Sequence, residues 1–140
     1  MRKLFILTLA AGALAVPAAT AAPTHGKPSG PKPCHGKARV MVVLKGTLAN
    51  VPAAGDTSFQ LTVLHTNRWG RGYRQATQPF TINMDPNTRY VKDDQPASLD
   101  ALALNDQVVV KSKASRCDLR DADPASMPAL TAKMVVDQTP

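Results

Sequence analysis

The sequence predicts an all-β protein, a small closed barrel of five to six strands. The chain contains 12 Pro, and all ten of its acidic residues are Asp, a residue that disfavours helix interiors. Five extended segments recur between turn-forming residues, at 38–48, 57–66, 80–84, 108–110 and 130–137. One short helical turn, at 98–102, falls between the third and the fourth strand. This order is that of an OB-like barrel, and closure covers the sheet edges without further helices.

The first predicted strand carries apolar residues on both of its faces. Val42 and Leu44 point to one side, and Met41 and Val43 to the other. This pattern indicates a strand that is covered on both sides or that curls round a small barrel. Gly46 then interrupts the strand, and such a Gly often marks a bulge that lets a sheet coil.

The next strands show a simpler alternation. Phe59, Leu61 and Val63 alternate with mostly polar neighbours in the second strand, and Ile82 lies at the centre of the third. The segment 88–91 resumes an extended path and is the optional sixth strand. We expect 67–78 to be a loop or hairpin tip, and 115–129 to be a polar loop.

The helical turn and the residues after it are expected to close one barrel end. Ser98 can cap the turn, and three leucines would plug the barrel, at positions 99, 102 and 104. Asn105 suits a left-handed turn position before the fourth strand, which lies within the run 107–111. In an OB-like barrel the first and fourth strands pair antiparallel.

The sequence predicts export followed by a single domain. Residues 1–21 read as a signal peptide, with Arg2 and Lys3 before an apolar run and a small-x-small cleavage site at Ala19-Thr20-Ala21. Residues 22–37 read as a flexible leader rich in Pro, Gly and Lys, and 38–137 as the barrel. The apolar run is too short to span a membrane stably. We therefore expect a secreted or periplasmic protein without a membrane span.

Two cysteines, Cys34 and Cys117, are the simplest candidates for one disulfide in an oxidising compartment. The bridge would close a loop of 83 residues, and the chain-entropy model assigns such a loop about 4–5 kcal/mol. A metal site at Cys34 and His35 is the alternative, although the spacing lacks a CxxC motif. Cys34 precedes the first strand and Cys117 follows the fourth, so the expected pairing of these strands agrees with the bridge.

The order of these landmarks resembles the bacterial family known as domain of unknown function 5666, over roughly Val40 to Asp137. The family shows Gly-Asp where this chain has Asn105-Asp106, and 67–78 and the cysteine-bearing loop are longer than in the family pattern. The resemblance implies an exported small barrel and brings no activity with it. The landmarks that carry it are Gly46, Asp85, Thr88, Ser98, Leu99, Leu102, Asn105, Asp106, Val108, Val110 and the run 132–136.

The segment 68–74 is the main candidate for a binding site. Three guanidinium groups, two aromatic rings and two Gly lie within seven residues, with the ligand-binding side chains expected to be Arg68, Trp69, Arg71, Tyr73 and Arg74. Arginine forks match phosphate and carboxylate groups, and aromatic faces stack on bases or sugar rings. The alternative is a solvated tip whose two aromatic side chains cover apolar surface.

A second candidate is the acidic loop with Asp118, Asp121 and Asp123. Three carboxylates at this spacing can hold Ca²⁺, but Arg116 and Arg120 are interleaved with them and would compete by pairing. The sequence contains no G-x-S-x-G or H-E-x-x-H motif, and a disulfide would consume both thiols. We therefore predict neither a catalytic site nor a cofactor.

The charge and the composition limit the kinds of partner that this protein can have. Removal of the signal peptide takes two cations away, which leaves 15 basic and 10 acidic residues and a net charge of +5. A basic exported protein is attracted to anionic polymers and surfaces. Only 4% of the residues are aromatic, which argues against single-stranded nucleic acid. The sequence predicts a monomeric, non-catalytic binding module of the cell envelope, for an anionic polymer or a protein partner. The alternative is a small envelope enzyme or metal-handling protein.

Overall fold

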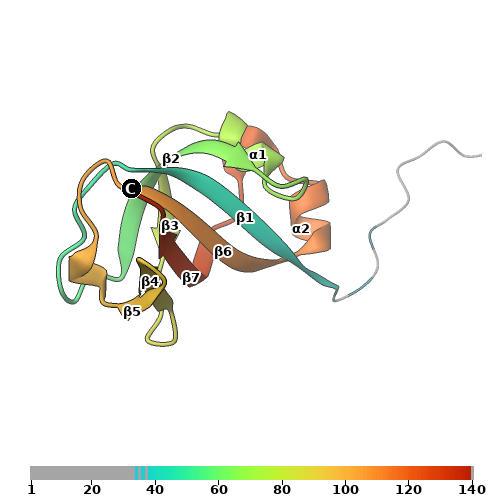
Figure 1. Cartoon of the computed structure of the whole chain (residues 1–140). Coiled ribbons are helices and arrows are strands. Elements are labelled where there is room, and N and C mark those ends of the chain that lie inside the picture. The colour runs from blue at the N-terminus through green and yellow to red at the C-terminus, as the bar shows by residue number, and fades with distance from the viewer. Residues whose placement is uncertain (1–33, 35, 37, 140) are drawn as a thin grey trace, which may run out of the picture. The chain divides into compact units, whose positions relative to one another are not determined.

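A computed structural model describes residues 34, 36 and 38–139, and within this part of the chain the protein is mainly β-structure (Figure 1). The predicted signal peptide and nearly all of the predicted leader lie outside the described residues. The strands are β1 (Arg39–Leu48), β2 (Ser58–Thr66), β3 (Phe80–Asn83), β4 (Arg89–Lys92), β5 (Gln95–Ala97), β6 (Gln107–Ser115) and β7 (Leu130–Asp137). The helices are α1 (Arg71–Gln75) and α2 (Arg116–Arg120), with 3₁₀ turns η1 (Leu99–Ala101) and η2 (Pro124–Ser126).

Five strands close a barrel, which confirms the predicted all-β, OB-like class. The long strand β1 pairs antiparallel with both β2 and β6, and β6 pairs antiparallel with β7. The barrel closes where β7 runs parallel to β3. The hairpin β4–β5 extends the sheet beyond this ring, through parallel pairing of β4 with β7. As predicted, a short helical turn lies between the third and fourth barrel strands.

Gly46 occupies the bulge expected of it. The register between β1 and β2 shifts between Lys45 and Gly46. A Cβ atom at position 46 would collide with the backbone carbonyl oxygen of Thr62, so the strands approach each other too closely there for any other residue. The bulge lets β1 bend and serve two neighbours in the barrel.

The barrel interior is filled by the alternating apolar residues of the strands. Leu102 is buried and seals one end, as predicted, and Leu99 packs against the core. Leu104 is 51% exposed, so its predicted place in the plug is wrong. η1 ends at Ala101, and the chain then turns at Asn105, which has a φ of 66°, as expected for a left-handed position. The core residues are Val42, Leu44, Leu48, Phe59, Leu61, Val63, Tyr73, Ile82, Leu102, Val108, Val110, Leu130, Ala132 and Val135.

Several boundaries differ from the prediction. β6 continues to Ser115, because it pairs with β1 along its whole length up to the pair Arg39–Ser115. The segments predicted as loops contain α1 in 67–78 and α2 and η2 in 115–129. β5 was not predicted; Asp93 and Asp94 both have positive φ and form the tight turn that precedes it.

The disulfide between Cys34 and Cys117 is present, with the two Cα atoms 5.4 Å apart. It joins the chain just before β1 to α2, directly after β6, and its position agrees with the antiparallel pairing of these strands. It excludes a metal site at Cys34. Among the described residues, no helix has the length and apolar character needed to cross a membrane.

Candidate anion-binding surface

The segment 67–78 is an ordered part of the barrel end. The Asn67 side chain donates to the Met41 carbonyl oxygen at 2.8 Å and accepts from the backbone N–H groups of Trp69 and Gly70. At the other end of the segment, the Gln78 side chain accepts from Val63 N–H and donates to the Tyr73 carbonyl oxygen. Two side-chain amides thus fix both ends of the segment to the strands beside it.

Tyr73 is not available to a ligand, which corrects the prediction that it lines the site. Its side chain is fully buried, packs edge-on against Phe80 and donates to the Pro128 carbonyl oxygen at 2.9 Å. Burial and the nearby Asp118 carboxylate raise the pKa of Tyr73, so the phenol stays protonated and keeps donating. The ring belongs to the core because α1 turns it inward, toward η2 and the start of β7.

Trp69 carries a stack of two guanidinium groups. The Cζ atom of Arg68 lies 4.6 Å from the centre of the Trp69 ring system, and that of Arg116 lies 5.6 Å from it. Trp69 is half-buried and packs against the core, so the indole is a fixed platform. Both distances are within the range of cation–π contacts. We call Arg68, Trp69 and Arg116 the arginine cluster.

Arg71 and Arg74 lie on α1 and are exposed. Among the described residues, neither of them forms an ion pair, and the arginines of the cluster form none either. Four guanidinium groups on neighbouring segments therefore keep their hydrogen-bonding capacity for a ligand. This arrangement suits phosphate or carboxylate groups, which arginine binds through two parallel hydrogen bonds.

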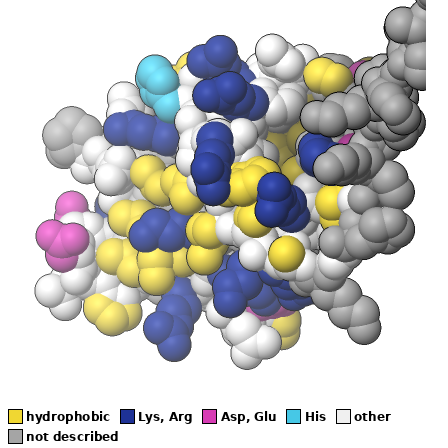
Figure 2. Space-filling model, turned by 90° about the vertical axis from the view of Figure 1, so that its right-hand side faces the viewer, with side chains coloured by type: hydrophobic (Ala, Val, Ile, Leu, Met, Phe, Trp, Pro, Cys, Tyr) yellow, Lys and Arg dark blue, Asp and Glu magenta, His cyan; other side chains and the backbone are white. Residues whose placement is uncertain are grey.

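The outer face of the sheet continues this positive surface. Its side chains form cross-strand rows in which cations and apolar residues are mixed. One row contains Lys45 and Val109, and the next contains Val43 and Lys111. Met41, which is 41% exposed, lies opposite Lys113. Figure 2 shows the same mixture on one face of the molecule, where basic side chains lie around and between hydrophobic ones and acidic side chains are few.

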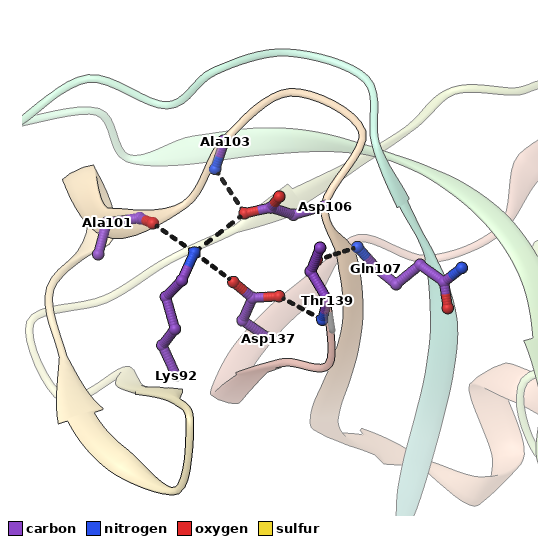
Figure 3. Close-up of polar contacts among 7 residues, drawn as sticks. All are labelled: Lys92, Ala101, Ala103, Asp106, Gln107, Asp137 and Thr139. Atoms are coloured by element: carbon purple, nitrogen blue, oxygen red, sulfur yellow. Dashed lines mark hydrogen bonds and ion pairs between the residues drawn. The ribbon is translucent and has the colours of Figure 1, made fainter.

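The opposite end of the barrel holds a connected polar network (Figure 3). Lys92 Nζ lies 2.7 Å from Asp137 Oδ2 and 3.5 Å from Asp106 Oδ2, and it donates to the Ala101 carbonyl oxygen. Asp106 also accepts from Ala103 N–H, and Asp137 from Thr139 N–H. We call Lys92, Asp106 and Asp137 the lysine–aspartate network.

The pKa shifts of Lys92 and Asp137 show that these two charges are used internally. Burial raises the pKa of Asp137, but hydrogen bonds from Lys92 and Thr139 lower it by more, so the net shift is downward. The hydrogen bond to Asp137 raises the pKa of Lys92. Two carboxylates and a lysine could in other settings perform acid–base catalysis. Here both carboxylates bind the lysine, and these contacts join η1, β4, the turn before β6 and the end of β7.

The acidic loop does not assemble the calcium site that its spacing allowed. Asp121 pairs with Arg120 at 2.9 Å, and the Asp123 side chain accepts from Ala125 N–H and caps η2. No group of three His, Cys, Asp or Glu side chains within the described part of the chain is placed to hold a metal ion. The interleaved arginine competes for a carboxylate in the way the sequence suggested.

The landmark at Asp85 and Thr88 is structural. The buried Thr88 hydroxyl donates to the Ala132 carbonyl oxygen at 2.8 Å and accepts from Asp85 N–H. The Asp85 carboxylate pairs with Lys133 of β7 at 2.6 Å. These contacts fix the turn before β4 to β7 and explain why a short polar side chain stands at each position.

Sequence reasoning missed Arg116 and the cations of the outer sheet face. The sequence indicates Arg116 only as a competitor for the acidic loop, whereas in the structure it directly follows β6 and lies over the Trp69 ring. The mixed rows follow from the antiparallel pairing of the first and fourth strands, which was predicted. Lys111 and Lys113 alternate with Val110 and Ser112, and this alternation indicates that β6 continues with one solvent-exposed face.

No protein-family model and no curated protein sequence matches this chain. Among solved structures, the one titled "Crystal structure of Ag(I)CusF" is similar, with a TM-score of 0.41 and 6% sequence identity. The alignment covers 71% of this chain and 99% of that chain. A likeness this distant carries no argument about the function of this chain.

Proposed function

We propose that this protein is an exported, non-catalytic binding module for an anionic polymer of the cell envelope. The observation that carries the proposal is the arginine cluster, in which Trp69 holds Arg68 and Arg116 in place while neither has an acidic partner among the described residues. Arg71 and Arg74 on α1 add two exposed charges beside it.

The physical basis is preorganisation. A free arginine loses side-chain entropy when it binds a ligand, and an indole platform reduces that loss. Because these guanidinium groups have no acidic partner among the described residues, a ligand does not have to displace a carboxylate to bind them. The resemblance to domain of unknown function 5666 and the predicted signal peptide remain part of this proposal. The disulfide supports export, because such bonds persist mainly in oxidising compartments.

Retention on an anionic matrix across a salt gradient tests the proposal. The first variant changes Arg68, Arg71 and Arg74 to Ser, and the control changes Lys27, Lys32 and Lys37 to Ser, which removes the same number of charges from the predicted leader. We expect the arginine variant to elute at clearly lower salt than the control. Equal elution of the two variants would mean that only net charge matters, and it would contradict a site at these arginines.

A further inference from the structure

The outer sheet face carries two shallow grooves on opposite sides of β6 and β7. One groove, of about 230 Å³, is lined by residues that include Lys45, Asn67 and Val109. The other, of about 510 Å³, is lined by residues that include Arg89, Val91 and Met134 and is bordered by the β4–β5 hairpin. The first groove begins at Asn67, directly before the arginine cluster, so the cluster adjoins one end of this face.

Two cross-strand rows connect the grooves. The first row runs from Lys45 on β1 through Val109 on β6 and Val136 on β7 to Val91 on β4. The second row runs through the same four strands, as Val43, Lys111, Met134 and Arg89. Strands in a sheet lie about 4.8 Å apart, so each row extends for about 14 Å. We call these two rows and the grooves at their ends the furrow.

The charges in the furrow are available to a ligand. Lys45, Lys111 and Arg89 form no ion pair with any described residue, whereas Lys92 and Lys133 nearby are both paired. The three cations stand on β1, β6 and β4, so they follow one another across the strands. An occupant that complements them is a linear chain with repeated negative charges, lying across the strands.

The apolar lining of the furrow limits the chemical class of the ligand polymer. Between the cations lie half-buried aliphatic side chains, which contact carbon–hydrogen surface but offer no platform for stacked bases. Tyr90 lines the larger groove and the His65 imidazole lines the smaller one, and no other aromatic ring of the described residues lines either groove. A sugar ring with a carboxylate supplies both an apolar carbon–hydrogen face and a charge in every repeat, whereas a polyphosphate supplies only the charge.

We propose that the furrow binds a linear uronate polysaccharide, with Lys45, Lys111 and Arg89 pairing with successive carboxylates and the aliphatic rows contacting the sugar rings. This inference rests on the proposed function and names the chemical class of its polymer. The arginine cluster then binds the polysaccharide where it leaves the furrow, at the end lined by Asn67.

Binding of a purified oligogalacturonate to the full-length mature protein, measured by calorimetry, tests the furrow. One variant changes Lys45 and Lys111 to Gln, and the control changes Lys27 and Lys32 to Gln, which removes the same charge from the predicted leader. We expect the furrow variant to bind about tenfold more weakly than the control. This factor corresponds to the summed free energies of two exposed ion contacts. Equal loss in both variants would overturn the furrow while leaving the proposed function intact.

A third variant, Val109→Asn, and a polyphosphate of matched charge test the role of the sugar ring. We expect Val109→Asn to weaken binding of the oligogalacturonate and to leave binding of polyphosphate unchanged. If polyphosphate binds as tightly as oligogalacturonate and the variant affects neither, the assignment to uronates is wrong. If the unmodified protein binds no anionic polymer at all, the proposed function itself fails. Circular dichroism of each variant verifies that the barrel remains folded.

Discussion

The two ends of the barrel are closed by different kinds of contact. At the end with the disulfide, a covalent bond and the buried Tyr73 hold the structure, and the arginines nearby face solvent. At the other end, Lys92 is held by two carboxylates and a carbonyl oxygen. The difference shows that a cation in this protein is either part of the fold or free for a ligand, depending on whether an acidic residue was placed beside it.

Removal of the disulfide is expected to have the largest effect. The double change Cys34→Ser and Cys117→Ser opens a loop of 83 residues, for which the chain-entropy model gives about 4–5 kcal/mol. We expect the melting temperature to fall by more than about 10 °C, since one kcal/mol corresponds to several degrees in a domain of this size. Calorimetry of the variant measures this directly. An unchanged melting temperature would mean that the barrel end is stable without the bond.

Loss of the Lys92 side-chain charge is expected to come next. Lys92→Met leaves the carboxylate of Asp137, whose side chain is only 1% exposed, without its cation. Removing one partner of such a pair leaves an uncompensated buried charge, so we expect a melting temperature lower by several degrees. The double variant Lys92→Met with Asp137→Leu should recover part of the loss. Failure of this rescue would show that the lysine acts through its packing alone.

Tyr73→Phe isolates one contact of the disulfide end. The change removes the hydrogen bond to the Pro128 carbonyl oxygen and keeps the buried ring, so we expect a loss of about 1 kcal/mol in the free energy of unfolding. Urea unfolding measures this value. Binding to anionic polymers should not change, because the ring is inaccessible; a clear loss of binding in the folded variant would return Tyr73 to the site.

The stability of the lysine–aspartate network depends on pH in a defined direction. The pKa of Asp137 is lower in the folded protein than its ordinary value, so its contribution is complete at neutral pH and is lost as the pH falls through the folded pKa. The pKa of Lys92 is raised, so its contribution is lost as the pH rises through that value. We expect urea midpoints of the wild type to fall more steeply in acid than those of Asp137→Asn. Parallel curves would contradict this assignment.

The smallest effect on stability is expected at the furrow. Lys111 is exposed and forms no ion pair with the described residues, so Lys111→Gln should change the free energy of unfolding by less than about 0.5 kcal/mol. Thermal unfolding of this variant beside Lys92→Met compares a free lysine with a paired one. A similar loss in both variants would remove the distinction between the two regions.

Local patterns predicted much of the fold. The last strand has the predicted bounds, 130–137, and Gly46 and Asn105 stand at the bulge and the left-handed turn expected of them. These features follow from residue type and spacing over a few positions. The burial of Tyr73 could not be predicted in this way, because it depends on η2 and Pro128, 55 residues further along the chain.

The candidate site was predicted only in part. The segment with Arg68 and Trp69 was identified from its composition, but its partner Arg116 comes from a segment nearly 50 residues away. The lysine–aspartate network was missed for the same reason, since it joins three segments that look unremarkable separately. In both cases the chemistry arises from strand pairing, and residue type alone does not reveal which charges meet.

The short pairing between β3 and β7 has a consequence for how the barrel opens. Only the pairs Ile82–Leu130 and Asn83–Thr131 close the ring there, whereas β1 and β6 are joined along nine pairs. Local opening of the native state should therefore begin at the β3–β7 pairing. Such opening turns the closed barrel into a curled sheet with β3 at one edge. Deuterium exchange should reach the amides of β3 long before those of β1 and β6.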